Sequence, residues 1–312
     1  MHTQKRAEQD ALLELLRALK ARNYRWITPT PETQRRVLER PGHQSGVSLP
    51  DIFGWSLPFA PHVLAPDLLA LMQSAGIVVP CGNLLASTLR VSSLGDELFL
   101  HSAYPTVAED SVFFGPDTYR FARFIAQCAA PARRLVDVGC GSGAGAIVAA
   151  RASGASEVIM ADINPAALRL AFINASAAGV VAEVATSDVL QGLGGQFDLV
   201  VANPPYLVDD DKRIYRHGGD LMGAGLSLRI AREAAARLNP GGRLLLYTAS
   251  AIVEGIDPFA AAVIPMLRAS HCSVIYEEID PDVFGEELDR PAYRHVDRVA
   301  VVGVVAEKRI PQ

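Results

Sequence analysis

The chain has 312 residues, of which half are hydrophobic and one fifth are charged. This length allows a catalytic domain of roughly 200 residues beside a smaller domain, and the composition excludes an intrinsically disordered chain. The 29 basic and 34 acidic residues give a net charge of −5, which disfavours a nucleic-acid binder because such proteins usually carry a basic excess to meet phosphates.

The apolar runs of the sequence are well short of the roughly 18 residues that a membrane-spanning helix needs, and the polar first ten residues are unlike a signal peptide. The cysteines lie far apart without a CxxC pair, which disfavours a zinc site and indicates reduced thiols. The four cysteines are Cys81, Cys128, Cys140 and Cys272. We therefore expect a cytoplasmic protein with no metal and no membrane contact.

Residues 1–110 are expected to form an accessory domain of three helices and a β-hairpin. Apolar residues recur on one face of 7–22, and Thr30 with the proline after it is a start signal for a second helix. The predicted hairpin pairs 85–91 with 97–102. This order is typical of a winged-helix module, which would suit nucleic-acid binding. The acidic balance favours the other interpretation, homodimerisation or the covering of a substrate pocket.

Residues 111–312 are expected to form the main domain, because strands and helices alternate from residue 134 onward. The expected strands cover 135–138, 158–161, 182–186, 199–202, 243–247, 274–277 and 299–305. The expected helices cover 144–152, 165–178, 226–238 and 257–269. Such alternation calls for a mostly parallel sheet with helices on both faces. The fold class is therefore α/β, a Rossmann-like sheet of seven strands whose last strand is antiparallel, because no helix separates the final two.

A glycine-rich turn follows the first strand of this domain. Gly139, Gly141 and Gly143 stand directly after the strand and before a helix, where glycine lets the backbone turn tightly and approach a ligand closely. The free N–H groups and the positive dipole end of that helix favour an anionic group. A carboxylate or a pyrophosphate would suit the turn equally well, and the spacing also matches a loose dinucleotide fingerprint.

Three acids lie at or near the carboxyl ends of the first three strands, the edge at which open α/β sheets bind ligands. Asp162 stands where an acid accepts ribose hydroxyls, or caps the next helix. Asp188 stands where a side chain could meet the adenine amino group; its alternative role is to cap a surface turn. Asp137 lies in an apolar run and needs partners, so it orients the glycine turn or binds an amino group. Three neighbours are expected in the same site: Cys140, Ile163 and Ser187.

The tetrapeptide Asn203-Pro204-Pro205-Tyr206 follows the fourth strand. Its prolines stiffen the turn and leave carbonyls free to accept hydrogen bonds. The Asn203 amide oxygen and the Pro204 carbonyl would grip the N–H groups of a planar nitrogen, and the Tyr206 ring would stack on its face. Together with the glycine turn, this motif indicates a binding site for S-adenosylmethionine (SAM) beside a planar nitrogen acceptor, with Asn203 bordering both.

These residues resemble the class I SAM-dependent methyltransferases over 113–308, and within them the HemK-type enzymes that modify glutamine side chains of polypeptide release factors. The similarity rests on the glycine turn, Asp162 and the complete tetrapeptide. Two further segments are similar to family segments, 114–118 before the SAM domain and 217–225 after the motif. The resemblance implies a SAM cofactor and transfer of a methyl group to a glutamine amide of a protein or peptide.

One departure from the family and one ambiguity of the motif keep the acceptor open. The N-terminal domain, ending in a hairpin, does not match the five-helix bundle of the HemK family, and adenine N6-methyltransferases also use the tetrapeptide. An RNA or DNA base, adenine or guanine, is therefore an alternative acceptor, although the acidic charge disfavours it. A small-molecule enzyme, including one that uses SAM for another reaction, is a third. Substrate-selective residues are expected in the polar loop after the tetrapeptide, at Arg213, Tyr215, Arg216 and His217. The stretch 282–295 is expected to form another wall of the site, with no function assigned to it.

Overall fold

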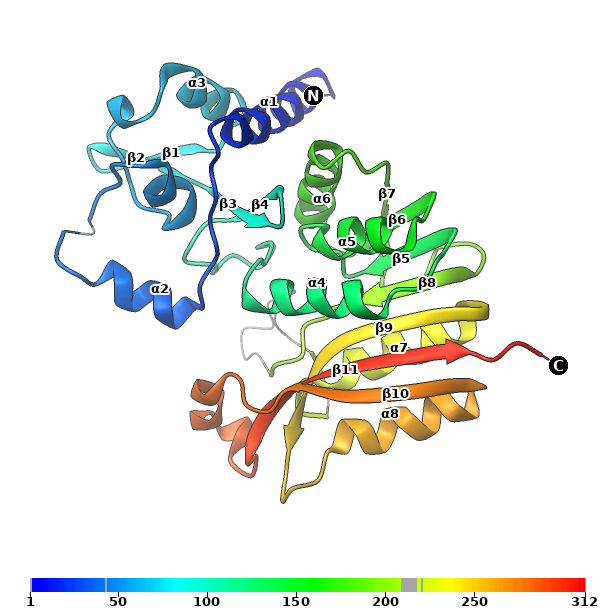
Figure 1. Cartoon of the computed structure of the whole chain (residues 1–312). Coiled ribbons are helices and arrows are strands. Elements are labelled where there is room, and N and C mark those ends of the chain that lie inside the picture. Colours follow the sequence, from blue (N-terminus) through cyan, green and yellow to red (C-terminus); the bar gives the residue numbers. More distant parts are fainter. Residues whose placement is uncertain (1, 43, 209–217, 220, 312) are drawn as a thin grey trace.

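The computed structural model describes residues 2–42, 44–208, 218–219 and 221–311 (Figure 1). Its centre is a seven-stranded sheet in the order β10-β11-β9-β8-β5-β6-β7. The strands are β5 (Arg134–Val138), β6 (Glu157–Asp162), β7 (Glu183–Thr186), β8 (Phe197–Ala202), β9 (Leu238–Ile252), β10 (Cys272–Asp280) and β11 (Arg298–Lys308). All pairs from β7 to β9 are parallel, while β11 is antiparallel to both of its neighbours. The predicted fold class is confirmed.

Helices cover both faces of this sheet. They are α4 (Pro116–Cys128), α5 (Ala144–Ser153), α6 (Pro165–Ala177), α7 (Gly225–Arg237) and α8 (Pro258–Ala269). Strand residues alternate between two core clusters, so that Leu199 packs with α4, α5 and α6 while Val200 packs with α7 and α8. The central strands are apolar toward both faces, as expected for parallel strands buried on each side.

The N-terminal part contains three helices and two small hairpins. The helices are α1 (His2–Ala21), α2 (Pro31–Leu38) and α3 (Pro66–Ser74), and the hairpins pair β1 (Val78–Cys81) with β2 (Leu84–Ser87) and β3 (Leu89–Leu94) with β4 (Glu97–Ser102). The predicted N-cap is confirmed, because the Thr30 hydroxyl accepts a hydrogen bond from the Thr33 N–H at 3.1 Å.

The prediction of a single strand over 85–91 is wrong. The chain breaks at Thr88, so the residues before it pair with β1 and those after it pair with β4. The Ser87 hydroxyl lies in this break, where it donates to the Leu89 carbonyl and accepts from the Leu89 N–H. The hairpin of β1 and β2 was not predicted, since its strands are short and only one of their residues is buried.

The N-terminal part packs against α6 (Figure 1). Ala167, Leu170 and Ile173 of α6 belong to the same core cluster as the apolar face of α1. Asn174 of α6 also bonds both backbone groups of Leu100 on β4, at 2.9 and 3.0 Å. Its Nδ2 donates in addition to the Ser142 carbonyl at 2.9 Å. One side chain therefore joins the N-terminal part to the glycine turn.

Two predictions for this part of the chain remain predictions: the boundary near residue 110 and the winged-helix architecture. The interior is built mainly from α1, α3, the turn Pro50–Gly54 and the second hairpin, whereas α2 buries only Gln34. Across the described ranges, none of the helices combines the length and the apolar character that a membrane crossing requires.

Candidate active site at the carboxyl edge of the sheet

The register of the central strands brings the two main motifs together. Val138 of β5 pairs with Ala202 of β8 in a parallel ladder. The next residue on each strand is Gly139 on one side and Asn203 on the other, so the glycine turn and the tetrapeptide begin side by side. The edge at which they meet is the one predicted for ligand binding.

The glycine turn has a backbone that only glycine adopts readily. Gly139, Gly141 and Gly143 have φ angles of +69°, +52° and +78°. A Cβ on Gly143 would lie 3.1 Å from both Ala171 and Met160, whereas one on Gly139 would meet nothing within 4 Å. The turn thus packs tightly against the protein at its end and faces open space at its beginning.

Asp162 closes this turn from the neighbouring strand. One carboxylate oxygen accepts from the Gly141 N–H and the other from the Asn164 N–H, both at 2.9 Å. The helix cap anticipated for Asp162 is provided by Asn164 instead, whose side chain accepts from the Ala166 N–H. Burial raises the pKa of Asp162. Beside it, Ile163 is half exposed and presents an apolar side chain at the edge of the site.

Asp137 is the most deeply buried acid of the group, with 2% of its surface exposed. Its carboxylate accepts from the Ala146 N–H in the first turn of α5 at 2.7 Å and lies so close to Gly145 that a Cβ there would be 2.7 Å from its oxygen. This contact ties β5 to the helix that follows the glycine turn, and both roles predicted for Asp137 stay predictions. Burial raises the pKa of Asp137 to about 7. Cys140, on the turn, is also buried, which raises the pKa of its thiol well above the usual value.

The residues after β7 are held by local bonds and an ion pair. The Ser187 hydroxyl is hydrogen-bonded to the carbonyls of Val189 and Gln191. Asp188 forms a two-pronged ion pair with Arg229 of α7, with distances of 2.8 and 2.9 Å. Asp188 is therefore fixed by a partner distant in sequence, rather than by the surface cap that was its alternative role.

In the tetrapeptide, Asn203 and Tyr206 occupy different environments. Asn203 is partly buried, and its side chain makes no hydrogen bond to the residues that the structure describes. Tyr206 is 8% exposed, and its ring centroid lies 6.0 Å from that of Phe284. Burial first, and the nearby charge of Asp117 second, raise the pKa of Tyr206 well above its usual value. Tyr206 is thus a neutral phenol, and most of its ring surface contacts protein.

A buried acid beneath Tyr206 has no counterpart among the predicted site residues. Asp117 of α4 is 4% exposed and accepts a hydrogen bond from the Tyr247 hydroxyl at 2.8 Å. Arg120 lies 3.3 Å from Asp117 and 3.0 Å from Asp280. Although Asp117 belongs to the segment 114–118 singled out above, its position in a first helical turn indicates only a favourable helix dipole. Its hydrogen-bond partner Tyr247 comes from β9, which sequence spacing does not reveal.

The predicted wall at 282–295 does lie against the tetrapeptide. The turns Gly285–Asp289 and Pro291–Tyr293 follow Phe284. The Arg290 guanidinium donates to the Val208 carbonyl at 2.6 Å, and the Tyr293 hydroxyl accepts from the Val208 N–H at 2.8 Å. These contacts fix the backbone just after Tyr206.

The glycine-containing segment after the motif also contacts Tyr206. A Cβ on Gly223, where φ is +97°, would be 2.2 Å from the Tyr206 carbonyl oxygen, and one on Gly218 would be 2.7 Å from the Tyr206 Cα. Only glycine fits at either position. The polar residues predicted to select the substrate lie outside the described residues; they are Arg213, Tyr215, Arg216 and His217.

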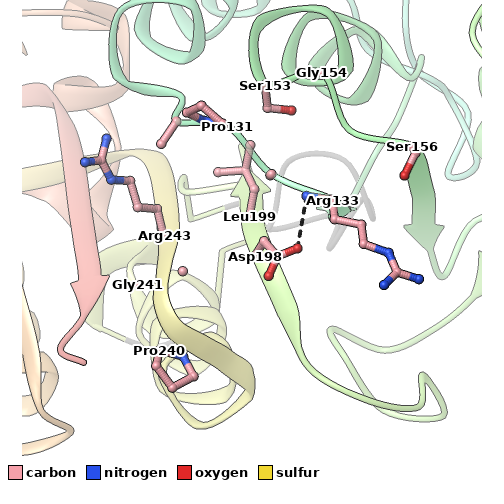
Figure 2. A pocket seen from close by; sticks show the side chains of 13 residues that line it. Pro131, Arg133, Ser153, Gly154, Ser156, Asp198, Leu199, Pro240, Gly241 and Arg243 are labelled. Atoms are coloured by element: carbon pink, nitrogen blue, oxygen red, sulfur yellow. Dashed lines mark hydrogen bonds between the residues drawn. The ribbon is translucent and has the colours of Figure 1, made fainter. Parts of the chain in front are cut away.

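A cavity of about 590 Å³ lies elsewhere, and none of the predicted site residues lines it. Figure 2 shows Asp198 and Arg133 on one side of this cavity and Arg243 on the other. The cavity lies where β5 and β8 begin, not at their carboxyl ends. Asp198 accepts there from the N–H groups of Arg133 and Arg134 and from Asn239. The glycine turn and the tetrapeptide therefore lie at the opposite ends of these strands from this cavity.

Known proteins resemble this chain in the region that carries the site. A family model described as Methyltransferase small domain matches residues 121–253. The release factor glutamine methyltransferase of Cereibacter sphaeroides is 33% identical over 196 residues, 56% of this chain and 69% of that protein. The protein of the same name from Deinococcus radiodurans is 36% identical over 165 residues, 49% of this chain and 55% of the relative. The ribosomal RNA small subunit methyltransferase C of Chromohalobacter salexigens is 37% identical over 115 residues, 36% of this chain and 31% of the relative.

The chain thus spans 55% of the Deinococcus relative's length and 69% of the Cereibacter relative's. Its sheet order and its glycine turn fit the resemblance expected from the sequence. On the identity and coverage shared with the Cereibacter protein, the chain belongs to the HemK-type family of class I SAM-dependent methyltransferases.

Proposed function

We propose that the chain is a SAM-dependent N-methyltransferase whose acceptor is the side-chain amide of a glutamine in a protein or peptide. One observation carries the proposal: Asn203, whose amide is bonded to none of the described residues, begins its turn beside the open end of the glycine turn. A cofactor site and a hydrogen-bonding corner for a planar nitrogen then share one edge of the sheet.

The residues at the carboxyl ends of β5, β6 and β7 suit SAM in their chemistry. The open start of the glycine turn leaves room for a ligand, and Asp162 would accept hydrogen bonds from ribose hydroxyls. The half-exposed Ile163 offers an apolar surface for an adenine ring, and Asp188 lies at the next strand end. Asp137 would balance the charge of an amino group. When bound, SAM supplies a methyl group activated by a sulfonium.

The tetrapeptide would prepare the acceptor. An amide nitrogen is a poor nucleophile because its lone pair is delocalised. By accepting its two N–H groups, the Asn203 side-chain oxygen and the Pro204 carbonyl would direct that lone pair outward, and the effect is one of orientation and electrostatics. Tyr206 would border the planar group as a neutral phenol, since its raised pKa makes it unsuitable as a base. The nitrogen becomes strongly acidic as it gains a bond, so no dedicated base is required.

The similar proteins favour a glutamine amide over other planar nitrogens as the acceptor. The Cereibacter and Deinococcus proteins are named for glutamine methylation of a release factor. The net charge of −5 also suits a protein acceptor better than a polyphosphate.

The test is a methylation assay with purified protein, methyl-labelled SAM and a full-length release factor. We expect label in the protein fraction, and mass spectrometry should place a single methyl group on a glutamine side chain. Asn203→Ala should abolish most of the labelling, while Asn239→Ala, a substitution at the far edge of the sheet, should leave it unchanged. Labelling that persists undiminished in Asn203→Ala would contradict the proposal.

A ribosomal RNA base is the second candidate acceptor, because the Chromohalobacter relative is named for ribosomal RNA methylation. Incubation with small ribosomal subunits, followed by nuclease or protease digestion, separates the two candidates. Nuclease-sensitive label and binding that weakens steeply with salt would favour RNA. Protease-sensitive label would favour the glutamine amide.

A further inference from the structure

A small cavity lies between the N-terminal part and the segment that leads into α4. It has a volume of about 30 Å³. Its lining includes Gln34 of α2, Arg90 of β3, His101 of β4 and the chain around Phe114. None of the residues assigned above to the SAM or acceptor site lines it, and it lies outside the proposed function.

Arg90 is the unusual residue of this cavity. It is 4% exposed, and two of its nitrogens, Nε and Nη2, are buried without any hydrogen-bond partner. These two atoms form one edge of the planar guanidinium and point in parallel, which is the arrangement that binds a carboxylate or phosphate by two hydrogen bonds at once. A buried charged donor that makes no hydrogen bond lowers the stability of the folded protein, so we expect these two nitrogens to have a partner.

No carboxylate serves as that partner among the residues that the structure describes. The ionisable groups that act on Arg90 are the phenols of Tyr24, Tyr104 and Tyr119. Burial lowers the pKa of Arg90 to about 10, which still leaves the guanidinium charged at neutral pH. His101 adds no charge, because burial lowers the pKa of its ring well below the usual value, and its Nε2 is hydrogen-bonded to the Ser92 hydroxyl at 2.8 Å.

A second residue of the cavity lining also has an unpartnered atom. The Gln34 Nε2 donates to the Trp55 carbonyl at 3.0 Å, which fixes the amide orientation and leaves Oε1 buried without a donor. Gln34 is 1% exposed. Two residues that line the cavity therefore carry unpartnered polar atoms, a charged donor edge on Arg90 and an acceptor on Gln34.

We propose that this cavity is a binding site for a small oxyanion, a carboxylate or hydrogen phosphate, held by the Nε and Nη2 edge of Arg90. A volume near 30 Å³ admits a group of a few atoms and excludes a nucleotide or a peptide. Water would satisfy the hydrogen bonds, but it would leave the buried charge without a counter-ion.

The test compares the melting temperature of the whole chain in formate, acetate, phosphate and chloride at equal ionic strength. A bound ligand present at tenfold its Kd should raise the Tm of a protein of this size by about 2 °C, and the rise should saturate. Non-specific salt effects increase without saturation. Equal Tm values in all four anions would overturn the proposal, and so would a chloride effect as large as that of the oxyanions.

Variants assign the effect to Arg90. Arg90→Lys keeps the charge and removes the two-pronged edge, and Arg90→Met removes both; we expect at least a tenfold weaker response to formate in either. Arg40→Met is the matched control at an exposed arginine and should respond as the wild type does. A full response in a folded Arg90 variant would overturn the assignment. Should neither variant fold, calorimetric titration of the wild type with formate decides, and absence of saturable binding would reject the site.

Discussion

The cofactor half and the acceptor half of the site are built in different ways. Asp137, the glycine turn and Asp162 come from one stretch of the chain and are fixed mainly by backbone hydrogen bonds within it. The acceptor half assembles the tetrapeptide with Asp117 and with Phe284, from segments far apart in sequence. The first half therefore depends on local spacing, and the second depends on the packing of the whole domain.

The strongest test of this division is Asn203→Ala. Loss of the orienting acceptor should lower kcat by at least ~10²-fold, in line with the removal of one preorganised contact. SAM affinity should change little, because Asn203 borders the cofactor half without holding it. Single-turnover kinetics and calorimetry measure the two quantities. Near-normal turnover would refute the role of Asn203, and a large loss of SAM affinity would erase the division between the halves.

Asp162→Ala should act in the opposite way. Both carboxylate oxygens hold backbone N–H groups of the cofactor half, and they are proposed to meet the ribose. We expect SAM binding to weaken tenfold or more, which corresponds to about 1.4 kcal/mol. At saturating SAM, turnover should recover. Unchanged SAM binding by calorimetry would rule the contact out.

SAM affinity should also depend on pH through Asp137. Because its pKa is raised to about 7, the free protein is largely protonated there at pH 6 and must lose that proton to pair with an amino group. Affinity should therefore fall about five- to tenfold between pH 7.5 and pH 6. The same change should be absent in Asp137→Asn. A flat pH profile in the wild type would disprove the pairing.

Phe284→Ala should give the smallest effect and confine it to the acceptor half. Removing the ring beside Tyr206 should raise the acceptor KM about three- to fivefold, an amount typical of one aromatic contact, with SAM affinity unchanged. Phe172→Ala, at a half-exposed phenylalanine on α6, is the matched control. A weakened SAM site in Phe284→Ala would mean that the halves are coupled.

This division also explains what the sequence allowed us to predict. All seven sheet strands were expected, six of them within three residues at each end, whereas β9 extends five residues beyond the expected strand in both directions. Buried strands are apolar runs, and the Asn164-Pro165 and Asp257-Pro258 pairs mark helix starts. The position of the glycine turn beside the tetrapeptide follows from parallel pairing of β5 and β8. Local pattern was sufficient for these features.

The remaining features depend on long-range contacts. Asp117 is hydrogen-bonded to Tyr247, 130 residues away, and Asp188 is paired with Arg229, 41 residues away. The spacing of these residues in the sequence predicts neither pair. The break at Thr88 depends on which neighbouring strand each half joins. Short exposed strands such as β1 carry too little apolar pattern to be recognised.

The three hydrogen bonds of Asn174 bear on how the chain can be shortened. A recombinant fragment that begins at the methyltransferase core would expose Ala167, Leu170 and Ile173 to solvent. In such a fragment Asn174 would keep its hydrogen bond to the Ser142 carbonyl but lose both of its hydrogen bonds to Leu100. Such a fragment should aggregate more readily than the complete chain, so biochemical work on the catalytic part is best done with the first hundred residues attached.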